Sequence, residues 1–178
     1  MPSSEDSRVT GHDVYLGLGS NVGDRAANLD AAMTALGRHI HIVSVSSTYE
    51  TEPVGFAAQT PFLNTTCRAE TSLNPHELLA VTQAIEAELG RVSSFKNGPR
   101  LIDIDILLFG SVCLQSRTLV IPHPAMPDRL FVLTPLAEIG PDVLHPVLMK
   151  TVTQLLQDCT DGHWVRATIG GDDVSAIR

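Results

Sequence analysis

GPRLIDIDILLF, residues 98–109, is an apolar run that two aspartates interrupt. Its isoleucines, with Gly-Pro before the run and Gly-Ser after it, indicate a β-strand. Because side chains alternate between the two faces of a strand, the isoleucines share one face and Asp103 and Asp105 share the other. Two carboxylates on one face repel each other and resist burial, so they need a compensating charge. A divalent cation meets this need, and such oxygen ligands suit Mg²⁺ bound together with substrate phosphates.

The Asp-x-Asp pair also has a simpler interpretation. Many strands turn one polar face to water, where such a pair is merely solvated. Aspartate is depleted in strands, however, and Arg91, Lys96 and Arg100 stand nearby in the sequence. Arginine can hold a phosphate at two points with its planar fork, so these neighbours favour a phosphate site. For Arg100, a structural salt bridge to one of the aspartates stays open as an alternative.

The segments before this strand alternate between strand and helix signals. Asp24 can cap a first helix that ends near Gly37, and Asn74 with Pro75 can open a second helix that ends at Gly90. Strands are predicted at residues 14–19, 40–49, 62–70 and 101–109, with loops at 50–61 and 91–100. The order β-α-β-β-α-β predicts an α+β fold of the ferredoxin-like type, an antiparallel sheet with two helices on one face.

The second half of the chain is predicted to be a C-terminal extension of this core. It contains a short strand pair around residues 118–121, a proline-rich turn, and helices near residues 128–139 and 151–159, the first with a possible break at Pro135. No internal repeat or long linker divides the chain. We therefore expect a flexible N-terminal tail at residues 1–12, a single domain at 13–160 and a C-terminal tail at 161–178.

The composition indicates a globular, acidic protein. Its 178 residues are 43% hydrophobic and carry a net charge of −8, which argues against a nucleic-acid or membrane-surface binder. Five of the 12 Lys and Arg nevertheless fall within residues 91–129, among them Arg117, which favours a small anionic ligand. Three scattered cysteines suggest neither a disulfide framework nor a zinc site. The polar N-terminus resembles no secretion signal, so we expect a cytoplasmic protein whose protein partners are unknown.

Two further groups of residues are candidate ligand contacts. Gln83 and Glu86 lie three residues apart on the second helix, away from its apolar stripe, where they could meet one ligand or simply face solvent. His123 stands between two prolines in a stiff turn. It could bind a phosphate or move a proton, and a plain surface histidine is an equally good interpretation.

Two aromatic residues and an asparagine suggest contacts to a flat ring. Phe62 and Phe131 could stack on such a ring, and Asn64 offers a donor and an acceptor to an amide-bearing edge, although each Phe alone is more often core. The glycines of residues 17–23 match neither the dinucleotide fingerprint nor the phosphate-binding P-loop. We interpret them as a tight turn that permits a close approach of neighbouring chain.

Six segments together resemble one family, the 6-hydroxymethyl-7,8-dihydropterin pyrophosphokinases of folate biosynthesis. In chain order they are LGSNVGD (18–24), TEPVG (51–55), FLN (62–64), GPRLIDIDIL (98–107), IPHP (121–124) and DRLFVL (128–133). The resemblance spans roughly residues 13–158, and the segment with the Asp pair is highly specific. The family has a ferredoxin-like α/β core, in agreement with the predicted order of elements.

The resemblance implies transfer of the pyrophosphoryl group of ATP to the hydroxymethyl oxygen of the pterin, leaving AMP. Asp103 and Asp105 would hold two Mg²⁺ ions, and Arg91 and Arg100 would bind the phosphates. The nucleotide would also meet Gln83, Glu86, Ile106, Val120, Ile121, His123 and Arg129. The pterin would meet Thr51, Pro53, Val54, Phe62, Asn64 and Phe131.

Some positions depart from the family pattern. Asn97 stands where an aromatic residue is common, Ser93 and Ser94 replace a stretch that is often basic, and Pro124 follows His123 in place of an aromatic. These changes affect how residues 91–100 close over the substrates more than they affect the reaction. The changes at Ser93, Ser94 and Asn97 also motivate one alternative, a non-catalytic ferredoxin-like module that binds a nucleotide or metabolite. A different nucleotidyl- or phosphotransferase built on the same Asp pair is a further possibility.

Overall fold

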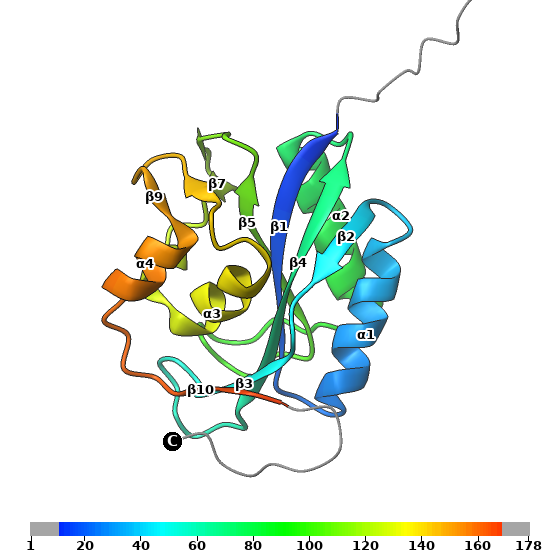
Figure 1. Ribbon diagram of the computed structural model, residues 1–178. Coiled ribbons are helices and arrows are strands. Elements are labelled where there is room, and N and C mark those ends of the chain that lie inside the picture. The colour runs from blue at the N-terminus through cyan, green and yellow to red at the C-terminus, as the bar shows by residue number, and fades with distance from the viewer. Residues whose placement is uncertain (1–10, 169–178) are drawn as a thin grey trace, which may run out of the picture.

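An antiparallel sheet packed between helices forms the core of the structure, a computed structural model that describes residues 11–168 (Figure 1). The first half contains β1 (His12–Ser20), α1 (Arg25–Leu36), β2 (His41–Val45), β3 (Tyr49–Thr51), β4 (Phe62–Thr71), α2 (Pro75–Glu88) and β5 (Asp103–Phe109). The second half contains β6 (Leu114–Gln115), β7 (Val120–Ile121), the 3₁₀ turn η1 (Met126–Asp128), α3 (Leu130–Ile139), β8 (Leu144–His145), β9 (Lys150–Thr151), α4 (Val152–Asp158) and β10 (Val165–Ala167).

Strand β1 lies between β4 and β5 in the six-stranded sheet. It pairs antiparallel with β4 on one side and with β5 on the other. The long strand β4 pairs at one end with β2 and at the other with β3, which in turn pairs with β10. The predicted combination of helices with an antiparallel sheet is therefore confirmed.

The first two helices begin where the sequence predicts. The Asp24 side chain accepts a hydrogen bond from the Ala27 N–H at 3.0 Å and caps α1. Asn74 and Glu77 form a reciprocal capping box at the start of α2, whose first residue is Pro75. These caps satisfy N–H groups that have no partner within the helix, and they therefore fix the residue at which each helix begins.

The two faces of the sheet have different cores. Leu16 and Leu18 of β1 point to the layer that contains α1 and α2, and they belong to the larger apolar cluster. On the opposite face, Tyr15 packs with residues of α3 and α4 in a second cluster. A β-bulge lets Leu107 and Leu108 both join this second cluster, because the β1–β5 register shifts at this point.

Three details differ from the sequence prediction. The single strand expected at residues 40–49 is wrong: β2 and β3 are separate, because the Ser46 hydroxyl accepts the Thr66 N–H at 3.0 Å in place of a ladder carbonyl. Helix α3 continues through Pro135, which is buried, so packing outweighs the lost hydrogen bond and the possible break does not occur. Strand β10 forms within residues that were expected to belong to the C-terminal tail. None of the helices within residues 11–168 has the length and apolar character needed to cross a membrane.

Candidate active site

Two glycines of β1 form the floor of the candidate site. In the β1–β5 ladder, Gly17 lies opposite Asp105 and Gly19 lies opposite Asp103. Because glycine has no side chain, the sheet is open at these positions, and a cavity of about 430 Å³ lies over them. A Cβ atom on Gly19 would come within 2.6 Å of the Asn64 Oδ1, so the close approach predicted for this glycine segment occurs at Gly19.

Asp103 is held by two arginines at one end of the cavity. The Arg91 Nη1 lies 2.9 Å from one oxygen of Asp103, and the Arg100 Nη1 lies 2.7 Å from the other. Glu86 on α2 pairs with Arg91 at 2.6 Å and accepts the Ile104 N–H of β5 at 2.6 Å. The salt bridge considered for Arg100 is therefore present, and Glu86 is a buried structural partner rather than a solvent-facing residue.

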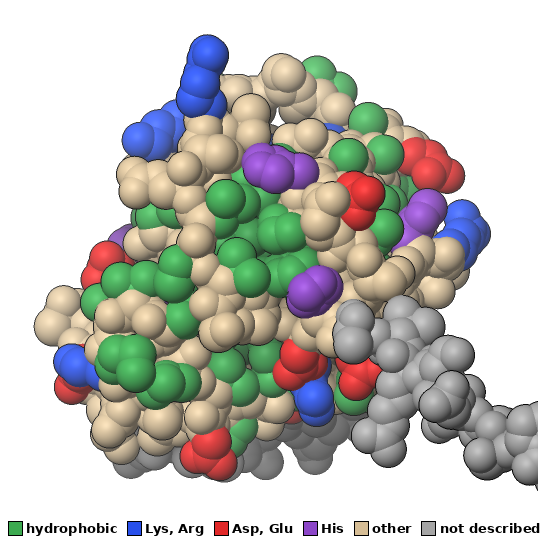
Figure 2. Space-filling model, turned by 90° about the horizontal axis from the view of Figure 1, so that it is seen from above, with side chains coloured by type: hydrophobic (Ala, Val, Ile, Leu, Met, Phe, Trp, Pro, Cys, Tyr) green, Lys and Arg blue, Asp and Glu red, His purple; other side chains and the backbone are tan. Residues whose placement is uncertain are grey.

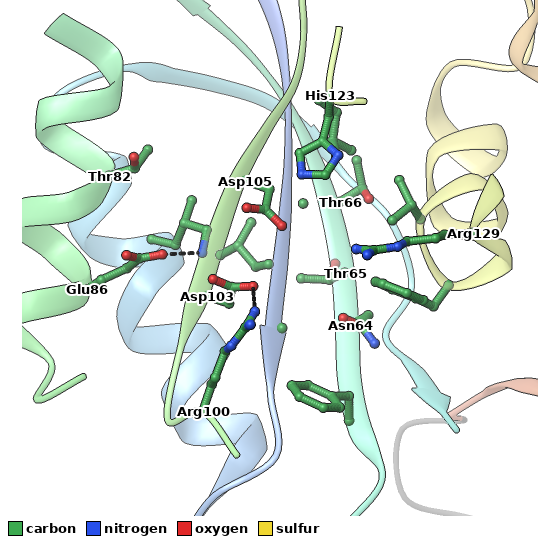
Figure 3. A pocket seen from close by; sticks show the side chains of 18 of the residues that line it. Asn64, Thr65, Thr66, Thr82, Glu86, Arg100, Asp103, Asp105, His123 and Arg129 are labelled. Atoms are coloured by element: carbon green, nitrogen blue, oxygen red, sulfur yellow. Dashed lines mark hydrogen bonds and ion pairs between the residues drawn. The ribbon is translucent and has the colours of Figure 1, made fainter. Parts of the chain in front are cut away.

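Asp105 has a different environment from Asp103. Among residues 11–168, no side chain or backbone group forms an ion pair or hydrogen bond with its carboxylate, which points into the cavity (Figure 3). Burial, together with the negative charges of Asp103 and Glu86, raises the pKa of Asp105 to about 7. The predicted pair of carboxylates on one strand face therefore lines one cavity, and its second member is short of positive charge.

The donor set fits Mg²⁺ bound together with a substrate. No cluster of three or more His, Cys, Asp or Glu side chains within the described part of the chain forms a complete protein cage for a metal. Asp103 and Asp105 supply two hard oxygen donors next to an open cavity. Mg²⁺ typically takes one or two carboxylates and completes its shell with phosphate oxygens and water, so this pair suits it.

His123 and Arg129 approach the same space from the opposite side (Figure 3). The backbone N–H of His123 donates to the Leu107 carbonyl at 3.0 Å, which holds the turn against the β5 bulge. The Ala125 N–H donates to the His123 Nδ1 at 3.2 Å, so the neutral ring carries its proton on Nε2. Burial and the nearby Arg129 charge lower the pKa of His123, which favours this neutral form.

Apolar and amide groups line the other end of the cavity. Val54, Phe62 and Phe131 contribute apolar surface, and Asn64 contributes its amide. The Asn64 Nδ2 donates to the Thr51 Oγ1 at 2.7 Å, which fixes the orientation of this amide. The cavity therefore has a charged end, and an apolar end with one oriented polar group. Arg129 adjoins the apolar end, since its guanidinium lies 5.6 Å from the centre of the Phe131 ring.

Most residues predicted for the site meet in this cavity. Those that line it are Arg91, Arg100, Asp103, Asp105, Gln83, Glu86, His123, Arg129, Val54, Phe62, Asn64 and Phe131. Those that do not line it are Thr51, Pro53, Ile106, Val120 and Ile121. The side chains of Ile106 and Ile121 belong to the core, so contact between their backbone and a nucleotide stays a prediction.

The basic cluster of the sequence is largely a cavity feature. Arg91, Lys96, Arg100 and Arg129 line the cavity, whereas Arg117 is exposed and does not. On the end of the molecule seen in Figure 2, by contrast, Lys and Arg appear as scattered groups. An acidic protein thus places four of its few cations around one cavity.

Several lining residues were not identified as ligand contacts from the sequence. They are Gly17, Leu18, Gly19, Glu52, Thr65, Thr66, Leu79, Thr82, Asn97, Ile104, Leu107 and Val132. A signal existed for Thr66, which lies two residues beyond Asn64 on the same strand face. For Glu52 and Thr82 no local pattern distinguishes them from ordinary loop and helix residues.

The fold and the site define a class of protein. An antiparallel sheet with paired carboxylates, facing arginines and an adjoining apolar pocket is suited to bring a polyphosphate and a small ring-containing molecule together. Residues 15–141 match the family model described as 7,8-dihydro-6-hydroxymethylpterin-pyrophosphokinase (HPPK). The chain therefore belongs to the HPPK family.

Relatives and solved structures agree with this assignment. The chain is 51% identical over 127 residues to the 2-amino-4-hydroxy-6-hydroxymethyldihydropteridine pyrophosphokinase of Bacillus subtilis, covering 70% of this chain and 76% of that protein. It is 44% identical over 147 residues to the enzyme of the same name from Aquifex aeolicus, covering 83% and 92%. A crystal structure of Plasmodium falciparum HPPK-DHPS superposes with a TM-score of 0.64 at 18% identity, which supports the fold. It covers 83% of this chain, which spans 41% of that longer protein.

Proposed function

We propose that the chain transfers the two terminal phosphates of ATP, as one pyrophosphoryl group, to the hydroxymethyl oxygen of 6-hydroxymethyl-7,8-dihydropterin, a step of folate biosynthesis. Membership of the pyrophosphokinase family supports this reaction. The observation that carries the proposal is the cavity itself, where Asp103 and Asp105 face the cations and adjoin an apolar pocket. These are the groups that phosphoryl transfer needs, since it depends chiefly on positioning and charge neutralisation.

The charged end of the cavity would bind the triphosphate. Arg91 and Arg100 already lie within 3 Å of Asp103, so a phosphate placed against the carboxylates meets both guanidinium groups. Arg129 and the Nε2–H of His123 approach from the other side and can donate to phosphate oxygens. Asp103 and Asp105 would hold two Mg²⁺ ions, which when bound neutralise phosphate charge and polarise the phosphoryl oxygens.

The apolar end of the cavity would bind the pterin. Phe62 and Phe131 provide flat apolar surfaces, and ring systems favour such stacked contacts. Asn64, oriented by Thr51, presents an amide to the polar edge of the ring. The hydroxymethyl group would then point toward the carboxylates, where its oxygen can meet the phosphate in line.

The test is product analysis with purified protein, ATP, Mg²⁺ and the hydroxymethyl dihydropterin. We expect AMP and a pterin diphosphate in equal amounts. Formation of ADP would instead identify a single-phosphate transfer, and binding of both ligands without turnover would identify the non-catalytic module. A chelator should stop the reaction, and added Mg²⁺ should restore it.

We also propose a fold type, domain bounds and a cellular location for the chain. The elements β1, α1, β2, β4, α2 and β5 follow the βαββαβ order, and the strand order β2-β4-β1-β5 supports a ferredoxin-like core. A single pyrophosphokinase domain would begin at about residue 13, and β10 argues for extending it past residue 160. Its substrates are small molecules, and we propose that it acts in the cytoplasm.

A further inference from the structure

The last described segment, residues 161–168, contacts β3, the loop that follows it and the start of α3, and we call it the C-terminal brace. It includes β10, which lies along β3 below α3 in Figure 1. The brace lies beyond residues 15–141, which match the family model. It nevertheless contacts two elements that supply cavity residues, the start of α3 and the loop that follows β3.

The first contact is between Asp161 and α3. Helix α3 begins after Arg129, whose side chain makes no capping hydrogen bond. Instead, the Leu130 N–H donates to the Asp161 Oδ2 at 2.9 Å, across 31 residues of sequence. The Asp161 side chain is only 5% exposed, so the brace supplies a buried carboxylate that satisfies the first N–H of α3 at the positive end of the helix dipole.

Asp161 is itself held in place by the brace. Its Oδ1 accepts the His163 backbone N–H at 3.0 Å and lies 2.5 Å from the His163 Nδ1. Burial alone would raise the pKa of Asp161, but the hydrogen bonds from His163 and Leu130 outweigh it and lower the pKa. The carboxylate is therefore ionised at neutral pH, and both of its oxygens accept hydrogen bonds.

The second contact is between Trp164 and Glu52. The Glu52 backbone N–H donates to the Trp164 carbonyl at 3.0 Å, and the Trp164 backbone N–H donates to the Glu52 Oε2 at 3.1 Å. The Arg166 guanidinium lies 4.8 Å from the centre of the Trp164 ring, which covers the ring on that side. Glu52 lines the cavity close to Val54, so this contact fixes the loop that carries both.

We propose that Asp161 is a positioning residue for substrate binding. It holds the first turn of α3, and with it Arg129 and Phe131, against the cavity, while Trp164 holds the loop that carries Glu52 and Val54. This inference rests on the proposed function, because Arg129 and Phe131 matter only if they contact the substrates. Asp161 touches no substrate itself, so its loss should weaken binding more than it slows the chemical step.

The test compares three variants of the full chain. Asp161→Ala removes the carboxylate, Asp161→Asn keeps an oxygen that can accept the Leu130 N–H, and Asp158→Ala removes an exposed ion pair with Lys150 that is remote from the cavity. The first measurement is amide hydrogen exchange of ligand-free protein. Asp161→Ala should speed exchange at the start of α3 by about tenfold, while the other two variants stay within threefold of wild type.

The second measurement is steady-state kinetics for both substrates. Asp161→Ala should raise KM about tenfold with kcat within threefold, and Asp161→Asn should restore most of the loss. Wild-type exchange and KM in Asp161→Ala, or an equal effect of Asp158→Ala, would overturn the proposal. If Asp161→Ala does not fold, His163→Ala replaces it, with an expected rise in KM of about threefold and an unchanged KM counting against the proposal. Wild type without pyrophosphoryl transfer would refute the proposed function, and the exchange data would then decide whether the brace holds α3.

Discussion

The two faces of strands β1 and β5 carry different kinds of residue. On the face toward α1 and α2, Leu16 and Ile106 are buried in the large apolar core. On the other face, at the adjacent position of each strand, Gly17 and Asp105 border the cavity. The two-residue period of a strand thus separates the groups that stabilise the fold from the groups proposed to do chemistry. Changes on one face should affect stability, and changes on the other should affect activity.

The largest expected effect is the loss of activity in Asp105→Asn. The substitution keeps the shape of the side chain but removes a charge proposed to hold metal beside the phosphates. We expect kcat to fall on the order of 10³-fold, comparable to losing other preorganised charged groups in active sites. The free energy of unfolding should stay equal or rise, because burial and the Asp103 and Glu86 charges already disfavour this carboxylate.

Thermal unfolding and the AMP assay on the same preparation measure both quantities. Asp13→Asn is a matched control, since Asp13 lies on the same sheet face but pairs with Arg68 outside the cavity. An Asp105→Asn protein within tenfold of wild-type kcat would refute the role proposed for this carboxylate.

The opposite outcome is expected for Leu16→Ala on the buried face. Leu16 is fully buried, and its truncation leaves a void between β1 and the helices α1 and α2. Losses of this kind cost about 2–5 kcal/mol of unfolding free energy. Urea denaturation measures the loss, while kcat per folded molecule should remain within about threefold of wild type. A large fall in kcat with unchanged stability would contradict the separation of the two faces.

Gly19→Ala tests how the floor of the cavity is shaped. The new Cβ would come within 2.6 Å of the Asn64 Oδ1, so the amide must move away from the position that Thr51 gives it. We expect KM for the pterin to rise about tenfold, equivalent to about 1.4 kcal/mol, with little change in KM for ATP. Gly17→Ala is the milder comparison, because its Cβ would meet only Leu107 at 3.4 Å. Equal effects on both substrates would show that the change acts on the whole cavity.

The sequence was informative where local rules determine structure. Alternation along residues 101–109 placed Asp103 and Asp105 on one face, and capping residues located the starts of α1 and α2. These features depend on neighbours in the chain, so one sequence suffices to predict them. The convergence of Arg91, Arg100 and Arg129 on the same cavity was suggested by charge clustering and by the family resemblance.

The features that the sequence did not reveal depend on distant pairing. The cap of α3 comes from Asp161, and β10 forms because β3 offers it an edge. The break between β2 and β3 follows from a hydroxyl of Ser46 that bonds across to β4. Such contacts join residues 20 to more than 100 positions apart, and no local propensity specifies them.

The smallest expected effect concerns Glu138 of α3, which does not line the cavity and links α3 to Ser47 and Tyr49. Its carboxylate accepts the Ser47 N–H at 2.9 Å, the Ser47 hydroxyl at 2.8 Å and the Tyr49 hydroxyl at 2.7 Å. Burial would raise the pKa of Glu138, but these hydrogen bonds lower it below its ordinary value of 4.5.

A carboxyl with a lowered folded-state pKa stabilises the protein at pH values above the unfolded-state pKa, and this stabilisation disappears as pH falls through the folded-state pKa. Because the group is largely exposed, Glu138→Gln should cost only about 0.5–1 kcal/mol at neutral pH. Urea denaturation of both proteins should show that difference shrinking below about pH 4.5. We expect kcat of Glu138→Gln to equal that of wild type. A stability difference that stays constant across pH would mean that the hydrogen-bond geometry, rather than the charge, provides the stabilisation.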